Sequence, residues 1–189
     1  MGGWCDPPSY HPKGTTYFLH IQGVLITYMW NLFCILAVMN LDYPVQKMDR
    51  SLLRKIVNHS MDWATDELHT PLMGVVPSYE LSSRLDVMAK YDDKTHMIVL
   101  GVKNIDTLRE LLQSFLHEWY HSTKDSEEYW DLHQKYGYEN HPHEKEARRY
   151  EKFYHLLYPY ICERLGTSPT AKDKWELWWG SLSIKTLGV

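Results

Sequence analysis

The length of this chain, 189 residues, suffices for one domain with a hydrophobic core but is short for two. Its formal net charge of −4 argues against a nucleic-acid binder that works through a basic surface. The three cysteines, Cys5, Cys34 and Cys162, form no C-x-x-C pair, so they indicate neither a disulfide framework nor a thiolate zinc site, and they favour a reducing compartment.

Residues 1–47 are predicted to form an N-terminal extension ahead of the globular domain. Within it, residues 17–41 are uncharged and mostly apolar, and their number suits one membrane-spanning helix. More Lys and Arg follow this stretch than precede it, so an anchor would leave the rest of the chain in the cytoplasm. Two alternatives remain open, namely a buried core helix and a true start at Met39 or Met48. We therefore expect a cytoplasmic protein, which is membrane-anchored if residues 17–41 span a bilayer.

A domain over residues 48–189 is predicted to begin with a helix and a group of short strands. Asp49 or Ser51 can cap a helix through LLRKIVNHSMDWATDEL, whose apolar residues recur at helical spacing. Extended segments follow at 73–76, 79–85 and 85–91, and a turn leads to a strand at 95–100. The last two segments form a β-hairpin pattern. Helices combined with a small sheet indicate the α+β class.

A second helix is predicted from residue 108, and it carries the motif with the clearest chemistry. Thr107 and Glu110 form a capping box, and apolar residues then recur at helical spacing. Within it, His117-Glu118-Trp119-Tyr120-His121 reads H-E-x-x-H. The two histidines project from one face, so both can bind a single Zn²⁺, and Glu118 can activate water as the catalytic base. Eleven histidines in the chain make a metal site more probable, and also a coincidental match.

A third metal ligand is expected on a downstream helix. Pro142 suits a first helical turn, and the helix should run through HEKEARRYEKFYHLLY until Pro159 kinks or ends it. The apolar residues of this helix form one stripe that faces the core. Extending the stripe toward the N-terminus of the helix places three candidate ligands beside the core. Periodicity alone does not choose among these three, which are His143, Glu144 and Glu146.

The HEWYH helix, the polar connection after it and the segment HPHEKEARRYEKF together resemble the gluzincin metallopeptidases. The resemblance covers about residues 85–165 and is greatest to the minigluzincins, which include ImmA/IrrE-like proteins. In those proteins the first Glu of an E-x-E/Q-A motif is the third zinc ligand, which here implies Glu144. The resemblance also implies a zincin-like fold, hydrolysis of peptide or protein substrates, and an edge strand, here residues 95–100, that holds the substrate backbone.

The chain departs from the larger gluzincins at Arg148, where they carry an Asp that accepts a hydrogen bond from a ligand His. An arginine cannot accept a hydrogen bond. Support for His117 is therefore expected from elsewhere, for example a backbone carbonyl. Arg148 itself is expected to pair with Glu144 or Glu151, or to face substrate. Three further residues are candidates for stabilising an oxyanion. They are Tyr150, Tyr154 and His155.

The chain is predicted to end in a short Trp-rich helix at residues 171–179, which is expected to cover the core with Trp175, Trp178 and Trp179. Two alternatives to a zinc metallopeptidase stay open. One is a zinc-binding regulatory or interaction protein on the same fold that hydrolyses nothing. The other is an SprT-like protease whose third ligand is a histidine. The candidates for that ligand are His133, His141 and His143.

Overall fold

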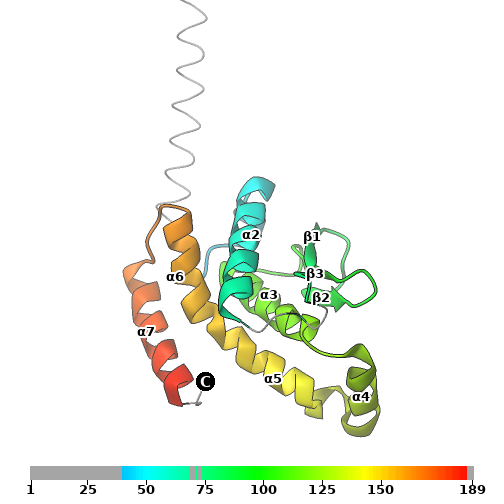
Figure 1. Ribbon diagram of the computed structural model, residues 1–189. Coiled ribbons are helices and arrows are strands. Elements are labelled where there is room, and N and C mark those ends of the chain that lie inside the picture. The colour runs from blue at the N-terminus through cyan, green and yellow to red at the C-terminus, as the bar shows by residue number, and fades with distance from the viewer. Residues whose placement is uncertain (1–39, 69–70, 72–73, 187–189) are drawn as a thin grey trace, which may run out of the picture. The chain divides into compact units, whose positions relative to one another are not determined.

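The protein is described by a computed structural model, in which residues 40–68, 71 and 74–186 are placed (Figure 1). These residues belong to one compact unit that begins at Val38, and the unit has an α+β fold with a small three-stranded sheet. Almost all of the predicted anchor, residues 17–41, lies outside the described residues. Among the helices that are described, none is long and apolar enough to cross a membrane.

The first helix, α2 (Arg50–Glu67), forms as predicted. The Asp49 side chain accepts a hydrogen bond from the Leu52 backbone N–H (2.8 Å) and caps the helix. The domain also includes residues upstream of the expected start at Met48. Leu41 and Val45 are buried, and Pro44 forms an isolated β-bridge with Thr107, so the segment before α2 packs against the start of the next helix.

The sheet contains β1 (Ser78–Ser82), β2 (Ala89–Asp92) and β3 (Met97–Gly101), in the order β1-β3-β2. The predicted hairpin is confirmed, because β2 and β3 pair antiparallel. The prediction that residues 95–100 form an edge strand is wrong, because β1 pairs with the other side of β3 in parallel and makes it the central strand. The edge strand beside α3 is β2. It is shorter than the predicted strand at 85–91, and residues 74–76 are not a strand.

Gly101, at the end of β3, fixes the segment that leads into β2. A Cβ at position 101 would lie 2.2 Å from the backbone oxygen of Val87, a distance that no side chain tolerates. The Gly101 N–H donates to the Met88 carbonyl (2.7 Å), and the Asn104 side chain donates to the Leu85 carbonyl (2.7 Å). The start of the edge strand is therefore set by a close backbone approach that only glycine permits.

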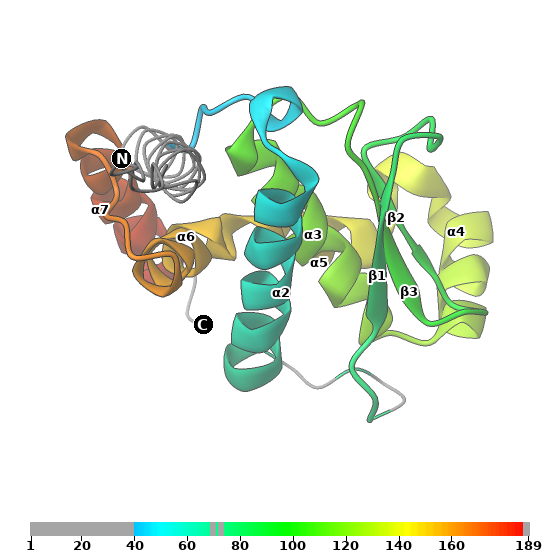
Figure 2. The same cartoon turned by 90° about the horizontal axis from the view of Figure 1, so that it is seen from above.

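Helix α3 (Leu108–Ser122) runs through the centre of the fold. Figure 2 shows α2 and α3 between the sheet on one side and α6 with α7 on the other. The capping box of α3 is formed as predicted. The Thr107 side chain accepts from the Glu110 N–H, and the Glu110 side chain accepts from the Thr107 N–H. Most of the residues of α3 that face these neighbours are buried. The helix is thus held on several sides, which fixes the direction of its remaining open face.

Helix α4 (Ser126–Asn140) occupies the segment that the sequence indicated only as a polar connection. It has no buried residue, and its course is broken at Gly137, where φ is +67°. The helix begins at an Asp125 cap, whose side chain accepts from the Glu127 N–H (2.7 Å). It extends away from the core (Figure 1), so its sequence carries little apolar periodicity.

The predicted helix after Pro142 is divided into α5 (Pro142–Tyr150), a 3₁₀ turn η2 (Glu151–Phe153) and α6 (Tyr154–Arg164). His141 caps α5 as expected, accepting from the His143 N–H (3.1 Å). The helix does not end at Pro159, which lies inside α6. The interruption comes earlier, at η2, where a 3₁₀ turn replaces the α-helical hydrogen bonds.

Helix α7 (Ala171–Thr186) follows a turn at Gly166, where φ is +69°. It is attached to α6 and to the start of the described chain through Asp173, which is 2% exposed. The expected burial of the tryptophans is wrong for Trp175 and Trp178, which are 64% and 53% exposed, because Asp173 and Leu177 occupy the inward face. The side chain of Trp179 lies outside the described residues.

Candidate metal centre

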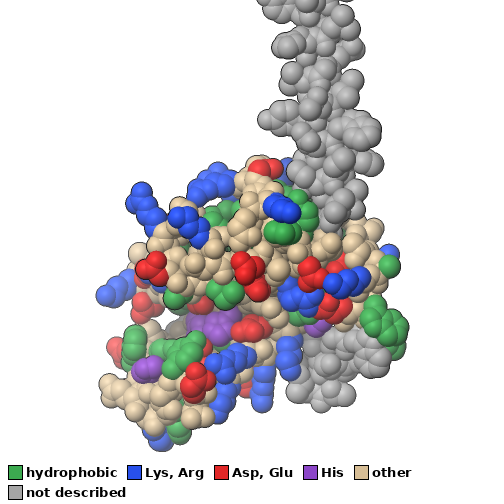
Figure 3. All heavy atoms as spheres, turned by 180° about the vertical axis from the view of Figure 1, so that it is seen from behind, with side chains coloured by type: hydrophobic (Ala, Val, Ile, Leu, Met, Phe, Trp, Pro, Cys, Tyr) green, Lys and Arg blue, Asp and Glu red, His purple; other side chains and the backbone are tan. Residues whose placement is uncertain are grey.

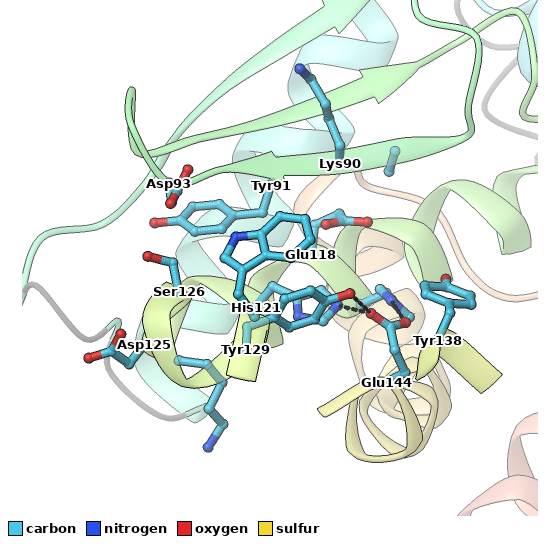
Figure 4. Close-up of a pocket in the computed structure, with 14 residues that line it drawn as sticks. Lys90, Tyr91, Asp93, Glu118, His121, Asp125, Ser126, Tyr129, Tyr138 and Glu144 are labelled. Carbon is cyan, nitrogen blue, oxygen red and sulfur yellow. Dashed lines mark hydrogen bonds and ion pairs between the residues drawn. The ribbon is translucent and has the colours of Figure 1, made fainter. Parts of the chain in front are cut away.

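His117 and His121 of α3 meet Glu144 of α5 in one cluster. Figure 4 shows His121 and Glu144 of this cluster. The distance from His117 Nε2 to Glu144 Oε2 is 3.3 Å, and that from His121 Nε2 to Glu144 Oε1 is 3.4 Å. One ligand atom from each residue lies within 4.8 Å of the other two. Within the described residues, this is the one group of at least three His, Cys, Asp or Glu side chains that meets this criterion.

The geometry of this cluster fits a zinc ion. Nitrogen and oxygen ligands of tetrahedral zinc, at roughly 2.0–2.2 Å from the metal, lie about 3.3–3.5 Å from one another. The two imidazole–carboxylate distances of 3.3 and 3.4 Å fall in this range, and each joins one histidine to a different oxygen of Glu144, so the carboxylate faces both imidazoles. Glu144 is only 2% exposed, and its buried Oε2 makes no hydrogen bond of good geometry. A buried carboxylate oxygen in this state is stabilised by a cation. The three residues can therefore hold a metal ion.

His117 is oriented by Glu151 of η2. The distance from His117 Nδ1 to Glu151 Oε1 is 2.8 Å. If Nδ1 donates to this carboxylate, Nε2 is the unprotonated nitrogen and presents its lone pair to a metal. The expected backbone carbonyl is thus replaced by a carboxylate. Arg148 pairs with neither predicted partner, since its nearest carboxylate is that of Glu139, at 3.9 Å.

Glu144 is oriented by Tyr129 of α4. The Tyr129 hydroxyl donates to Glu144 Oε1 (2.9 Å), as Figure 4 shows. The Tyr129 ring is stacked on His141, with centroids 4.2 Å apart, and His141 Nε2 donates to the Tyr129 carbonyl (2.9 Å). The residue that caps α5 therefore also positions the tyrosine that supports the ligand. Sequence reasoning missed Tyr129 because α4 itself was not predicted.

The other candidate ligands lie outside this cluster. Glu146 binds Arg149 on the exposed side of α5 (2.6 Å). The Nε2 atom of His143 lies 3.8 Å from Oε1 of Glu128 in α4. His141 uses both ring nitrogens in hydrogen bonds, and His133 lies beside the Tyr129 ring with centroids 6.1 Å apart.

The ionisable groups strongly affect one another's pKa values in the metal-free site. Burial raises the pKa of Glu118 to about 7. Burial and the nearby charge of His117 lower the pKa of His121 to about 4. Burial alone would lower the pKa of His117, but the carboxylates of Glu144 and Glu151 outweigh it and raise this pKa to about 9. Burial would raise the pKa of Glu144, yet His117 and Tyr129 hold it at about 2. Without metal, His117 and Glu144 therefore form an ion pair at neutral pH.

Glu118 lies in a cleft between β2 and α5. Two adjoining pockets of about 490 Å³ each share Ala89, His117, Glu118 and Tyr138 among their lining residues. Figure 3 shows histidine surface in a hollow on this face of the molecule. The backbone of Tyr91, in the edge strand, lies close enough to the Glu118 carboxylate to lower its pKa, against the larger effect of burial. The cleft thus follows the open side of α3 and the free edge of the sheet.

The predicted oxyanion residues do not line these pockets. The Tyr154 hydroxyl instead donates to Glu176 of α7 (2.7 Å). The Tyr150 ring, on α5, packs on the ring of Tyr120 in α3. His155, the third candidate, also lies outside the pocket linings. Two tyrosines of α4, Tyr129 and Tyr138, line the cavity in their place.

Comparison with known proteins yields no match, either to a family model, to a curated protein or to a solved structure. The interpretation of this centre therefore depends on its own geometry and chemistry.

Proposed function

We propose that this protein is a zinc-dependent peptidase of the gluzincin type with a zincin-like fold. The observation that carries the proposal is the meeting of His117, His121 and Glu144 at distances that suit zinc, with Glu118 in the same cleft. Three protein ligands leave one position of a tetrahedral ion open to water, which is typical of catalytic rather than structural zinc.

Zinc, when bound, supplies Lewis acidity that makes water more acidic and a peptide carbonyl more electrophilic. Glu118 accepts the proton of the attacking water and transfers it to the nitrogen of the leaving amine. A pKa of about 7 in the metal-free cavity suits a group that both accepts and donates a proton. The phenol of Tyr138 lies in the cavity lining, which supports a role in hydrogen-bonding the oxyanion, whereas the Tyr129 hydroxyl donates its one proton to Glu144. Within the described part of the chain no strand pairs with the outer side of β2, which therefore offers backbone groups to an extended substrate.

The ligand assignment is tested by metal analysis of purified protein. We expect about one zinc per chain in the wild type and loss of zinc in Glu144→Ala. Glu146→Ala and His143→Ala serve as controls and should retain the metal, since their side chains lie outside the cluster. Stoichiometric zinc in Glu144→Ala would contradict the assignment.

Cleavage is tested with the Glu118→Gln variant. Glutamine has nearly the same shape but cannot accept a proton, so this variant should bind zinc normally and lose hydrolysis of a diverse peptide library. If fully zinc-loaded wild type cleaves no peptide of such a library, a non-catalytic zinc protein replaces the peptidase proposal.

A further inference from the structure

We propose that the cleft selects extended peptides by two side chains, an aromatic residue before the scissile bond and a Lys or Arg after it. The inference rests on the proposed peptidase function and adds a substrate class to it. It is carried by the different linings of the two pockets that meet at His117 and Glu118.

The pocket nearer the start of α3 suits a basic side chain. Its charged lining residues are Glu110 and Glu151 together with Glu118, and its lining includes no Lys or Arg. Glu110 Oε2 accepts backbone N–H groups in the capping box, and Glu151 Oε1 contacts His117. The other oxygen of each carboxylate, Oε1 of Glu110 and Oε2 of Glu151, makes no hydrogen bond among the described residues. The opposite wall is apolar, formed by Val87 and Met88, which are 52% and 41% exposed. A Lys or Arg can lay its aliphatic stem on this wall and place its charge at the carboxylates.

The pocket nearer the end of α3 suits an aromatic side chain. Tyr91, Tyr129 and Trp130 contribute rings to its lining, and Trp130 is 59% exposed at this site. Its lining includes two Lys and two Asp, whose charges balance, in addition to the ligand Glu144 and the base Glu118, which face the metal site. Rings of a substrate can pack on these faces in offset or edge-on geometry, which adds to the burial of apolar area.

The direction of β2 sets the order of the two side chains. Val87 and Met88 precede this strand at the acidic pocket, and Asp93 follows it at the aromatic pocket. A peptide that pairs antiparallel with β2, the commoner mode of strand pairing, enters at the Asp93 end with its N-terminal part. Its aromatic residue therefore comes before the scissile bond and its basic residue after it. The face of α3 from Glu110 to His121 is about 16 Å long, enough for roughly five extended residues.

The order is tested with a pair of fluorogenic peptides of identical composition, one with Phe before and Arg after the scissile bond and the other reversed. We expect zinc-loaded wild type to cleave the first with a kcat/KM at least about tenfold higher, as one well-placed charged contact and one ring contact allow. Equal cleavage, or preference for the reversed peptide, would overturn the inference while leaving the peptidase proposal intact. If neither peptide is cleaved while the diverse library is, the inference is overturned and the peptidase proposal stands; if the library is not cleaved either, the peptidase proposal fails. Affinities of both peptides for zinc-loaded Glu118→Gln protein, followed by tryptophan fluorescence, then decide the binding preference separately.

Variants assign the preference to each pocket. Glu110→Gln keeps the capping box, which accepts Gln as well as Glu, and removes one charge. It should lower kcat/KM for the Arg peptide about fivefold more than that for a matched Gln peptide. Trp130→Ala should reduce the preference for Phe over Ala before the scissile bond. Matched controls are Glu80→Gln on β1 and Tyr136→Ala on α4, neither of which lines the cleft. Unchanged selectivity in both Glu110→Gln and Trp130→Ala would refute the assignment.

Discussion

At the scale of single residues, the Glu151 carboxylate determines which nitrogen of His117 faces the other ligands, through the 2.8 Å contact to Nδ1. We predict that Glu151→Ala lowers zinc affinity roughly 10- to 100-fold, the usual effect of removing the partner of a ligand histidine. Glu151→Gln should lower it less, because the amide oxygen still accepts from Nδ1–H. Chelator competition measures both affinities. Glu146→Ala is the matched control, and an equal loss in that variant would argue for a general effect of charge.

A second prediction follows from the pKa of about 9 that the Glu144 and Glu151 carboxylates give His117 despite its burial. Below this pH the metal-free His117 carries a proton, which zinc must displace. The apparent zinc affinity should therefore rise about tenfold per pH unit from pH 7 and flatten above about 9. In Glu151→Gln the pKa of His117 falls, so the plateau should begin at lower pH. Calorimetry in buffers of different ionisation enthalpy measures the released proton, and an affinity that is constant between pH 7 and 9 contradicts this account.

The residues of the centre differ in how far sequence alone could predict them. His117, Glu118 and His121 lie within one turn of one helix, so their common face follows from helical geometry. The choice of Glu144 needed a family resemblance, because helical periodicity left three neighbours equivalent. Glu151 and Tyr129 belong to other elements, and their contacts with the ligands arise from packing across the cleft. Such contacts leave no local pattern in the sequence.

At the scale of elements, the close approach at Gly101 connects the central strand to the cleft. We predict that Gly101→Ala destabilises the protein by about 1–3 kcal/mol, because a methyl group 2.2 Å from the Val87 oxygen forces the backbone apart. The same displacement moves the start of β2, so the KM for a peptide should rise even where the variant stays folded. Denaturant titration and steady-state kinetics measure the two effects. Gly166→Ala, a strained turn far from the cleft, should affect stability without raising KM.

Elements with local signals were predicted correctly, and those that depend on distant partners were not. The caps at Asp49 and Thr107 and the apolar stripes behind them gave α2 and α3 their bounds within a residue or two. Helix α4 escaped prediction because it buries no residue and so lacks an apolar stripe. The edge position of β2 depends on the parallel pairing of β1 with β3, which joins strands that are not adjacent in sequence.

At the scale of the whole molecule, Asp173 connects the two ends of the described chain. Its carboxylate accepts from the Leu41 N–H (3.3 Å), the Tyr158 hydroxyl (3.2 Å) and the Thr170 N–H (3.0 Å). We predict that Asp173→Ala costs about 2–4 kcal/mol, because several buried donors lose their acceptor together. Hydrogen exchange should increase in α7 and in residues 40–45, while zinc binding is retained.

Asp42→Asn is the control for this prediction. Asp42 pairs with Arg109 and Lys172, but its side chain is 45% exposed, so its ion pairs should contribute no more than about 1 kcal/mol. If both variants unfold at the same denaturant concentration, the buried network is not what attaches α7.

Helix α4 supplies walls of the cleft and yet contributes no residue to the core. Evolution can therefore alter what this cleft accepts almost independently of whether the chain folds. Substitutions on α4, apart from Tyr129 and Gly137, should change the free energy of unfolding by less than about 0.5 kcal/mol, as is usual for surface positions. A deep mutational scan that reads abundance and peptide selectivity side by side would reveal α4 as a region tolerant for folding and sensitive for selectivity. Helices α3 and α5 should show the reverse, because their side chains form both the core and the proposed metal site.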